Sequence, residues 1–310
     1  KRPFFTFIIP SKKLAFNWDI TMDIRSLAMG IVFALMWSSA FSSARIIVAS
    51  AAPLGALSIR FLISGLIGIL IARWLGQNFH LTKAQWKATI VFGIFQNALY
   101  LGLNFFAMQT IEASLASIIA SSMPLMVAFA GWVIFREHLS SLGALGLFLG
   151  FFGVVVIMWE RIKIGVDTFG IILCILGAAA LTIATLAVRG ASASGNVLMI
   201  VGLQMIVGSI CLGLVSLVFE DMSVTWSWPF ALAFIYTTLV PGLLATFIWF
   251  NLVNRIGAVK AATFHFLNPF FGVLIANIIL DEVVTFRDFI GVFIITGGIL
   301  AVQLSKQESR

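Results

Sequence analysis

A histidine and an asparagine stand close together inside a long apolar run near the end of the chain. His265 is the only histidine within such a run, and Asn268 follows three residues later. That spacing puts both side chains on one face of a helix. Because an imidazole titrates near neutral pH, we assign His265 as a candidate proton carrier and substrate contact, and Asn268 as a second substrate contact. The alternative is a neutral histidine that is hydrogen-bonded between packed helices.

A second group of polar side chains lies in an earlier apolar run. Asn97, Tyr100 and Asn104 are spaced i, i+3 and i+7, which places them along one side of an α-helix. Two amides exposed to lipid would be costly, so this stripe must face protein or a polar cavity. We predict a cavity wall, and hydrogen bonding between packed helices is the alternative.

Two prolines stand within apolar runs of similar sequence: "SSMPLMVAFAGWVIFREHL" around Pro124 and "FLNPFFGVLIANIILDEVV" around Pro269. Proline has no N–H to donate, and its ring crowds the carbonyl group four residues earlier, here that of Ala120 or His265. In lipid, a freed carbonyl group is tolerated only where protein or cavity water satisfies it. We therefore predict two mid-membrane kinks that act as hinges. Bends that serve packing alone are the alternative.

Three further side chains complete the predicted cavity, each with helix packing as its alternative role. Ser121 is the serine nearest to the first proline, and Trp37 lies one turn before a phenylalanine. Trp249 stands where the internal repeat described below places Asn104. Arg60 lies about six residues into its apolar run, where snorkelling toward the outer membrane surface is our favoured interpretation. A carboxylate-binding cation at the cavity mouth is the alternative for Arg60.

Signatures of enzymes and cofactors are missing from the sequence. No aspartate, glutamate or lysine stands clearly in the middle of an apolar run, and neither a phosphate-binding loop nor an H-E-x-x-H pattern occurs. Cys174 and Cys211 both lie within apolar runs, which disfavours a disulfide or a metal site. We therefore expect a protein that is not an enzyme and that needs neither cofactor nor metal.

The amino-acid composition indicates that most of the protein surface contacts lipid rather than water. The 310 residues are 61% hydrophobic and 10% charged, whereas soluble chains average about 25% charged residues. The net charge of +7 comes from residues at the ends of apolar runs, so membrane topology explains it better than nucleic-acid binding. These observations predict a polytopic integral membrane protein.

Ten apolar runs can each cross a bilayer, which needs about 20 residues. They are 26–44, 54–72, 88–108, 112–134, 141–159, 168–188, 196–218, 229–253, 258–280 and 288–305. With the N-terminus placed in the cytoplasm, fourteen of the 19 Lys and Arg residues fall inside. The outer five are Arg45, Arg60, Arg161, Lys163 and Arg287. This bias predicts that both termini are cytoplasmic.

The two proline phrases belong to an internal repeat with an offset of 145 residues. Eight identical pairs fall between residues 111 and 153 and their counterparts: Ile111/Ile256, Ala113/Ala258, Ala116/Ala261, Pro124/Pro269, Glu137/Glu282, Gly146/Gly291, Phe148/Phe293 and Gly153/Gly298. Each half then holds five spans, and five is odd, so the second half must insert upside down. We divide the chain into an N-terminal segment 1–25, a first repeat 26–159, a second repeat 168–305 and a tail 306–310.

At these positions the chain resembles the EamA-type ten-helix members of the drug/metabolite transporter superfamily. The resemblance runs from about residue 28 to 304 and rests on "ALMWSSAFSSARII", "APLGALSIRFLISGLIG" and the two A-x-x-A…P…E…G phrases. It implies an all-α membrane fold with two inverted five-helix repeats around a central cavity. It also implies export of amino acids, related metabolites or drugs.

Together these features predict a secondary transporter of the inner (cytoplasmic) membrane that exports a small metabolite by alternating access. An amino acid or related compound is our preferred cargo, and His265 is the candidate carrier if transport is coupled to protons. The expected partners are membrane lipid and the small-molecule substrate, without nucleic acid. The alternatives are a drug or toxic-compound efflux carrier, a passive channel whose flux does not saturate, and a structural membrane subunit.

Overall fold

The computed structural model describes the chain except residues 1–22, 164, 188–195, 257–260, 262 and 309–310. Most of the predicted N-terminal segment and the last two residues of the predicted tail therefore lie outside the described residues. Within them the secondary structure is helical, apart from one residue-pair bridge between Ala51 and Val224.

The helices follow the predicted spans closely. Nine described stretches are long and apolar enough to cross a membrane, and the shorter apolar stretch Phe264–Leu280 lies where the ninth span was predicted. In chain order the elements are α1 (Ile24–Val48), α2 (Pro53–Trp74), α3 (Lys83–Phe92), η1 (Gly93–Tyr100), α4 (Leu101–Ala107), α5 (Ala113–Ser121), α6 (Met123–Phe135), α7 (Ser141–Lys163), α8 (Thr168–Ala187), α9 (Val197–Phe219), α10 (Trp228–Thr237), η2 (Thr238–Leu244), α11 (Ala245–Ile256), η3 (Phe264–Leu267), α13 (Asn268–Leu280) and α14 (Phe286–Glu308).

Side chains that precede the helices explain several of these boundaries. Asp23 accepts a hydrogen bond from the backbone N–H of Ser26 and so caps α1. Thr82 and Gln85 form a reciprocal capping box at the start of α3. The hydroxyl group of Ser227 accepts from the N–H of Phe230 at the start of α10. Capping side chains therefore fix the starts of these three helices.

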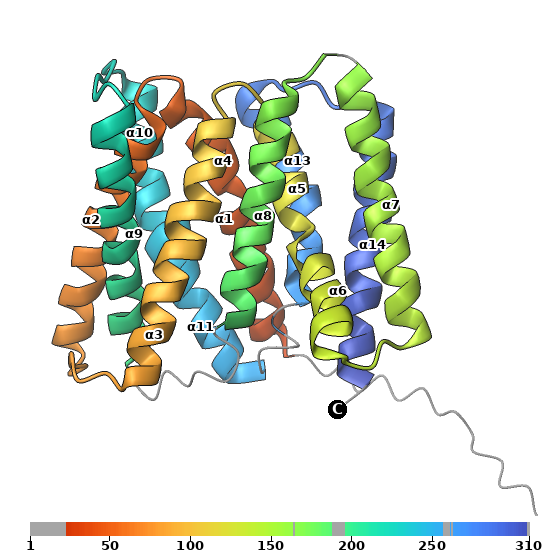
Figure 1. Cartoon of the computed structure of the whole chain (residues 1–310), viewed down its shortest axis with the longest axis horizontal. Coiled ribbons are helices and arrows are strands. Elements are labelled where there is room, and N and C mark those ends of the chain that lie inside the picture. The colour runs from red at the N-terminus through yellow and green to blue at the C-terminus, as the bar shows by residue number, and fades with distance from the viewer. Residues whose placement is uncertain (1–22, 164, 188–195, 257–260, 262, 309–310) are drawn as a thin grey trace, which may run out of the picture.

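The internal repeat is visible in the helix boundaries. α10, α13 and α14 each begin and end 145 residues after α3, α6 and α7, respectively. The π-helical segments η1 and η2 also begin 145 residues apart. We call the face where α1 begins and α14 ends the terminal face. In Figure 1 the chain leaves this face along α3 and α4 and returns to it along α10 and α11. The predicted two inverted five-helix repeats are thus confirmed.

The two prolines break their spans rather than kink a continuous helix. Pro124 and Pro269 each stand second in a new helix, α6 and α13, where a proline needs no N–H partner. Before Pro269 the chain tightens into the short 3₁₀ segment η3, so the N–H of Asn268 donates to the carbonyl group of His265. The carbonyl group of His265, which the sequence predicted to be freed, therefore accepts a hydrogen bond from the backbone.

Equivalent helices of the two halves pack against each other at the ends of the bundle. Figure 1 shows α2 beside α9 at one end and α7 beside α14 at the other. Centrally, α1 packs against α13, α10 and α11 of the second half, while α8 packs against η1 and α4 of the first. Most of the packing of α1 and α8 therefore joins the two halves.

Carboxylates of the second half cap helices of the first half on the face opposite the terminal face. The Glu220 carboxylate accepts from the N–H groups of Leu54 and Gly55 at the start of α2. The Glu282 carboxylate accepts from the N–H groups of Ala113 and Ser114 at the start of α5. Each carboxylate thus satisfies two backbone donors that a helix start would otherwise leave open.

Candidate functional site

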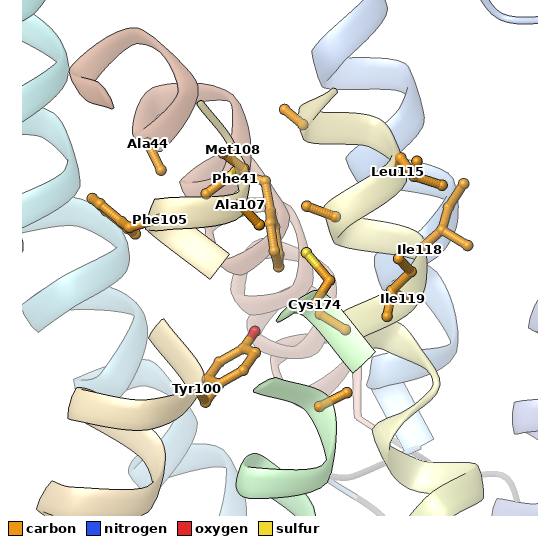
Figure 2. Packing of buried hydrophobic residues seen from close by; sticks show 14 of the residues in the cluster. Phe41, Ala44, Tyr100, Phe105, Ala107, Met108, Leu115, Ile118, Ile119 and Cys174 are labelled. Atoms are coloured by element: carbon orange, nitrogen blue, oxygen red, sulfur yellow. The ribbon is translucent and has the colours of Figure 1, made fainter. Parts of the chain in front are cut away.

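A cavity lies within the first half, against η2 of the second half, in the part of the bundle nearer the opposite face. Its volume is about 50 Å³, which is room for a few water molecules. It is lined by α1, α2, η1, α4 and η2, through Trp37, Ala40, Phe41, Ala44, Arg60, Tyr100, Leu101, Asn104, Phe105, Met108 and Pro241. In Figure 2 Tyr100 lies below Phe41, Phe105 and Met108 and extends its ring upward toward Phe41.

Three polar side chains face this mostly apolar cavity. Asn104 is 1% exposed, and its amide nitrogen donates to the carbonyl group of Tyr100, while its Oδ1 atom has no hydrogen-bond partner. Tyr100 is also 1% exposed, and no hydrogen bond joins its hydroxyl group to another described residue. Arg60 contributes the third polar group. An amide, a phenol and a guanidinium side chain therefore line one small space.

Arg60 corrects our interpretation from the sequence. We expected a side chain that snorkels to the membrane surface, but Arg60 is only 5% exposed and lines the cavity. Its guanidinium carbon lies 4.8 Å from the ring centre of Phe61 and 5.9 Å from that of Phe105. Its Nε atom is buried without a hydrogen-bond partner. The rotation of α2 about its own axis turns this residue inward, and a helix that is apolar on all sides gives no sequence signal of that rotation.

Aromatic rings fill the bundle between the cavity and the terminal face. The Phe33 ring centre lies 4.7 Å from that of Trp249 and 5.5 Å from that of His265, and the latter two centres are 5.0 Å apart. We call Phe33, Trp249 and His265 the aromatic cluster. Phe33 is one turn nearer the terminal face than the cavity residue Trp37, and their ring centres are 5.8 Å apart. The cluster therefore lies directly below the cavity.

The other predicted site residues lie outside the cavity lining. Asn97 donates from its amide nitrogen to the carbonyl group of Gln204, so it joins η1 to α9. Ser121 donates to the carbonyl group of Ser117 one turn earlier. Asn268 accepts the Ser38 hydroxyl group at its backbone oxygen, and its buried Oδ1 atom has no partner. Of the predicted substrate contacts, Trp37, Tyr100 and Asn104 share the cavity, whereas Trp249 and His265 share the aromatic cluster.

An ion pair ties the two halves together at the terminal face. The Asp23 carboxylate at the start of α1 lies 3.1 Å from the Arg255 guanidinium near the end of α11. Donation from the Ser26 N–H, aided by Arg255, holds the pKa of Asp23 below its usual value. Because both side chains are nearly half exposed to solvent, the pair contributes little to stability by itself. The pair connects the start of α1 to the end of α11 at the terminal face.

Sequence reasoning missed several cavity residues. Phe105, Met108 and Pro241 line the cavity, yet as apolar residues in a chain with 30 phenylalanines and ten methionines they gave no distinguishing signal. Pro241 stands inside the π-helical segment η2. A proline within an apolar run is the one distinguishing signal, and the internal repeat does not mark it, since the equivalent residue of the first half is Gln96.

Comparison with known proteins gives consistent matches over nearly the whole chain. The model of the EamA-like transporter family matches residues 24–159 and 168–304. The uncharacterized transporter YvbV of Bacillus subtilis is 24% identical over 89% of this chain and 90% of its own length. An uncharacterized transporter of Archaeoglobus fulgidus is 26% identical over 89% and 96%, respectively. One solved crystal structure, 18% identical, superposes with a TM-score of 0.66 over 90% of this chain and 98% of its own.

Proposed function

Because the chain belongs to the EamA-like transporter family, we propose that it is a secondary transporter that exports a small metabolite, with an amino acid or related compound as the cargo. The resemblance found in the sequence is thereby confirmed at the level of the family. Export, the class of cargo and the mechanism below are our proposals.

The position of the cavity supports the proposal that the protein works by alternating access. The cavity is lined by four elements of the first half and by Pro241 of the second half, and the aromatic cluster packs beneath it on the side of the terminal face. Inverted halves can exchange conformations, so that a central site opens to either side in turn. We propose that the halves rock about the breaks at Pro124 and Pro269, and that the aromatic cluster separates as the terminal face opens.

The chemistry of the lining supports an amino acid as cargo. The side chains of Arg60, Tyr100 and Asn104 can contact polar groups, while Trp37 and Phe41 offer apolar and aromatic surface. A small solute with polar ends and an apolar side chain matches that arrangement. The cavity has room for only a few water molecules in this conformation, so binding such a solute requires the lining helices to separate.

For orientation, we propose that the terminal face is cytoplasmic and that the protein resides in the inner (cytoplasmic) membrane. The excess of Lys and Arg residues in the segments assigned to that face supports this orientation. Epitope tags on both termini should then be reachable by antibody only after the cell membrane is permeabilised. A tag that reacts on intact cells would contradict the orientation.

Proteoliposomes test the transport proposal directly. Vesicles loaded with single amino acids from a panel should accumulate the matching labelled amino acid by counterflow, with saturable kinetics. Asn104→Ala should raise the apparent KM about tenfold, because the variant loses a polar side chain from the cavity lining. Asn251→Ala is the matched control, since that asparagine on α11 is exposed and bonds only within its helix.

Two results would contradict the proposal. Flux that rises linearly with concentration and shows no counterflow would indicate a passive channel. Absence of flux for every panel member, from protein that remains monodisperse and thermally stable, would exclude amino-acid transport under these conditions of assay. An increase in KM that is equal for Asn104→Ala and Asn251→Ala would remove Asn104 from the site.

Proton coupling through His265 is a separate proposal. His265 lies in the aromatic cluster against Phe33 and Trp249, where addition of a charge would oppose close packing of the rings. We expect an imposed pH gradient to drive net uptake in the wild-type protein and to lose that effect in His265→Ala, while counterflow persists. An equal response to the gradient in both proteins would dismiss His265 as the carrier.

A further inference from the structure

We propose that Arg60 is the binding site for the carboxylate group of the cargo, and that the cargo is an α-amino acid held by Arg60 and Asn104 at its two charged ends. This inference rests on the proposed transport function and names the residue that holds the carboxylate group of the proposed cargo. It begins from a cation that the bundle buries without a partner.

The surroundings of Arg60 leave its charge uncompensated by protein. The side chain is 5% exposed, and no ion pair or hydrogen bond joins it to any other described residue. The rings of Phe61 and Phe105 provide cation–π contacts, which offset only part of the cost of removing a cation from water. The cavity lining contains no aspartate or glutamate. The missing anion is therefore supplied by a bound solute.

A carboxylate group fits this place better than a phosphate group. The guanidinium fork matches the two oxygens of a carboxylate with two parallel hydrogen bonds. A phosphate group carries nearly two negative charges, and Arg60 is the only cation among the residues that line this cavity. The remaining lining is largely aromatic and aliphatic, which favours a monoanion over a dianion.

Asn104 and the nearby rings suit the ammonium end of the same molecule. The Oδ1 atom of Asn104 is buried without a partner and accepts from an N–H donor. Trp37, Phe41 and Tyr100 line the same space and present ring surfaces that attract an organic cation. Once the lining helices separate, a zwitterion placed between Arg60 and Asn104 gives each of these side chains a partner, which neither a simple amine nor a simple carboxylate does.

Arg60 also lies where the two halves meet. A Cβ atom built on Gly242, in η2 of the second half, would lie 3.9 Å from the Nη2 atom of Arg60. Asn104 belongs to α4 of the first half. A solute that draws Arg60 toward its carboxylate group therefore acts at the contact between α2 and η2, so binding is linked to the relative position of the halves.

The test compares each amino acid with its amide, in which the carboxylate group is replaced by a neutral carboxamide. In wild-type proteoliposomes, L-phenylalaninamide and L-leucinamide should inhibit counterflow at least about tenfold more weakly than L-phenylalanine and L-leucine. Arg60→Gln should raise the KM for the amino acids at least about tenfold and abolish this discrimination. Arg60→Lys should retain part of it, because the charge remains while the fork is lost. Arg73→Gln on the same helix, whose guanidinium lies over Phe79, should behave as wild type.

A binding measurement separates failure of this inference from failure of the transport proposal. The amino acids, and not their amides, should raise the thermal midpoint of the detergent-solubilised wild-type protein, and this difference should vanish in Arg60→Gln. Equal effects of acid and amide on the wild type, or discrimination that survives in Arg60→Gln, would overturn the inference while leaving transport intact. If no panel member is exchanged, the transport proposal fails, and the thermal shift alone decides the carboxylate site.

Discussion

Gly298→Val is expected to lower the thermal midpoint of the detergent-solubilised protein by about 5 °C or more, and to reduce the fraction that elutes as a monodisperse peak. A Cβ atom at Gly298 on α14 would lie 2.5 Å from the backbone nitrogen of Gly150 and 2.7 Å from the carbonyl oxygen of Gly146, both on α7. Backbone atoms cannot rotate away as a side chain can. Helices α7 and α14 would therefore have to separate, and overpacking of this kind costs about 1–3 kcal/mol or more.

The chain provides a matched control for this substitution at the adjacent residue. A Cβ atom at Gly297 would meet nothing within 4 Å, so Gly297→Val adds the same side chain to the same helix without a clash. It should leave the thermal midpoint within a degree or two of wild type. Equal midpoints for the two variants would show that the α7–α14 interface tolerates separation, which would contradict close packing of small residues as the basis of this helix pair.

The fold was predictable because identical proline and glutamate residues recur at equivalent positions of the two repeats. Pro124/Pro269 and Glu137/Glu282 set an offset of 145 residues, and the helix boundaries follow the same offset. The break at each proline was not predictable, because a proline in an apolar run is compatible with either a kink or a new helix start. The π-helical segments gave no signal either, since their longer backbone spacing requires no particular residue type.

The candidate site was predictable only in part, and η1 explains why. Asn97, Tyr100 and Asn104 share one stripe if the helix has an α-helical period. Asn97 and Tyr100 instead lie in π-helical η1, whose wider turn rotates Asn97 away toward Gln204 on α9 while Tyr100 and Asn104 reach the cavity. Trp249 and Asn104 occupy equivalent positions in opposite halves, yet Asn104 lines the cavity whereas Trp249 belongs to the aromatic cluster.

Phe33→Ala should increase access to the cavity from the terminal face by about tenfold or more. Phe33 contacts the rings of Trp37, Trp249 and His265, and each such contact contributes about 0.5–1.5 kcal/mol beyond the area that it buries. Two of these contacts, with Trp249 and His265, join the two halves, and together they contribute about 1–3 kcal/mol. A change of roughly 1.4 kcal/mol shifts an equilibrium tenfold. The measurement uses Ala40→Cys, a cavity position, in a protein whose Cys174 and Cys211 are replaced by alanine. A membrane-impermeant thiol reagent is added to sealed vesicles on one side at a time.

The direction of the change on the two sides distinguishes a carrier from a loosened bundle. In alternating access the two openings exclude each other, so a substitution that favours opening at the terminal face must slow labelling from the opposite face. A channel, or a bundle that merely packs less well, would instead be labelled faster from both sides. Phe247→Ala is the control, because that phenylalanine on α11 is 54% exposed and should alter neither rate. Labelling that rises equally on both faces would therefore contradict rocking of the two halves about a shared cavity, even if the cargo proves to be an amino acid.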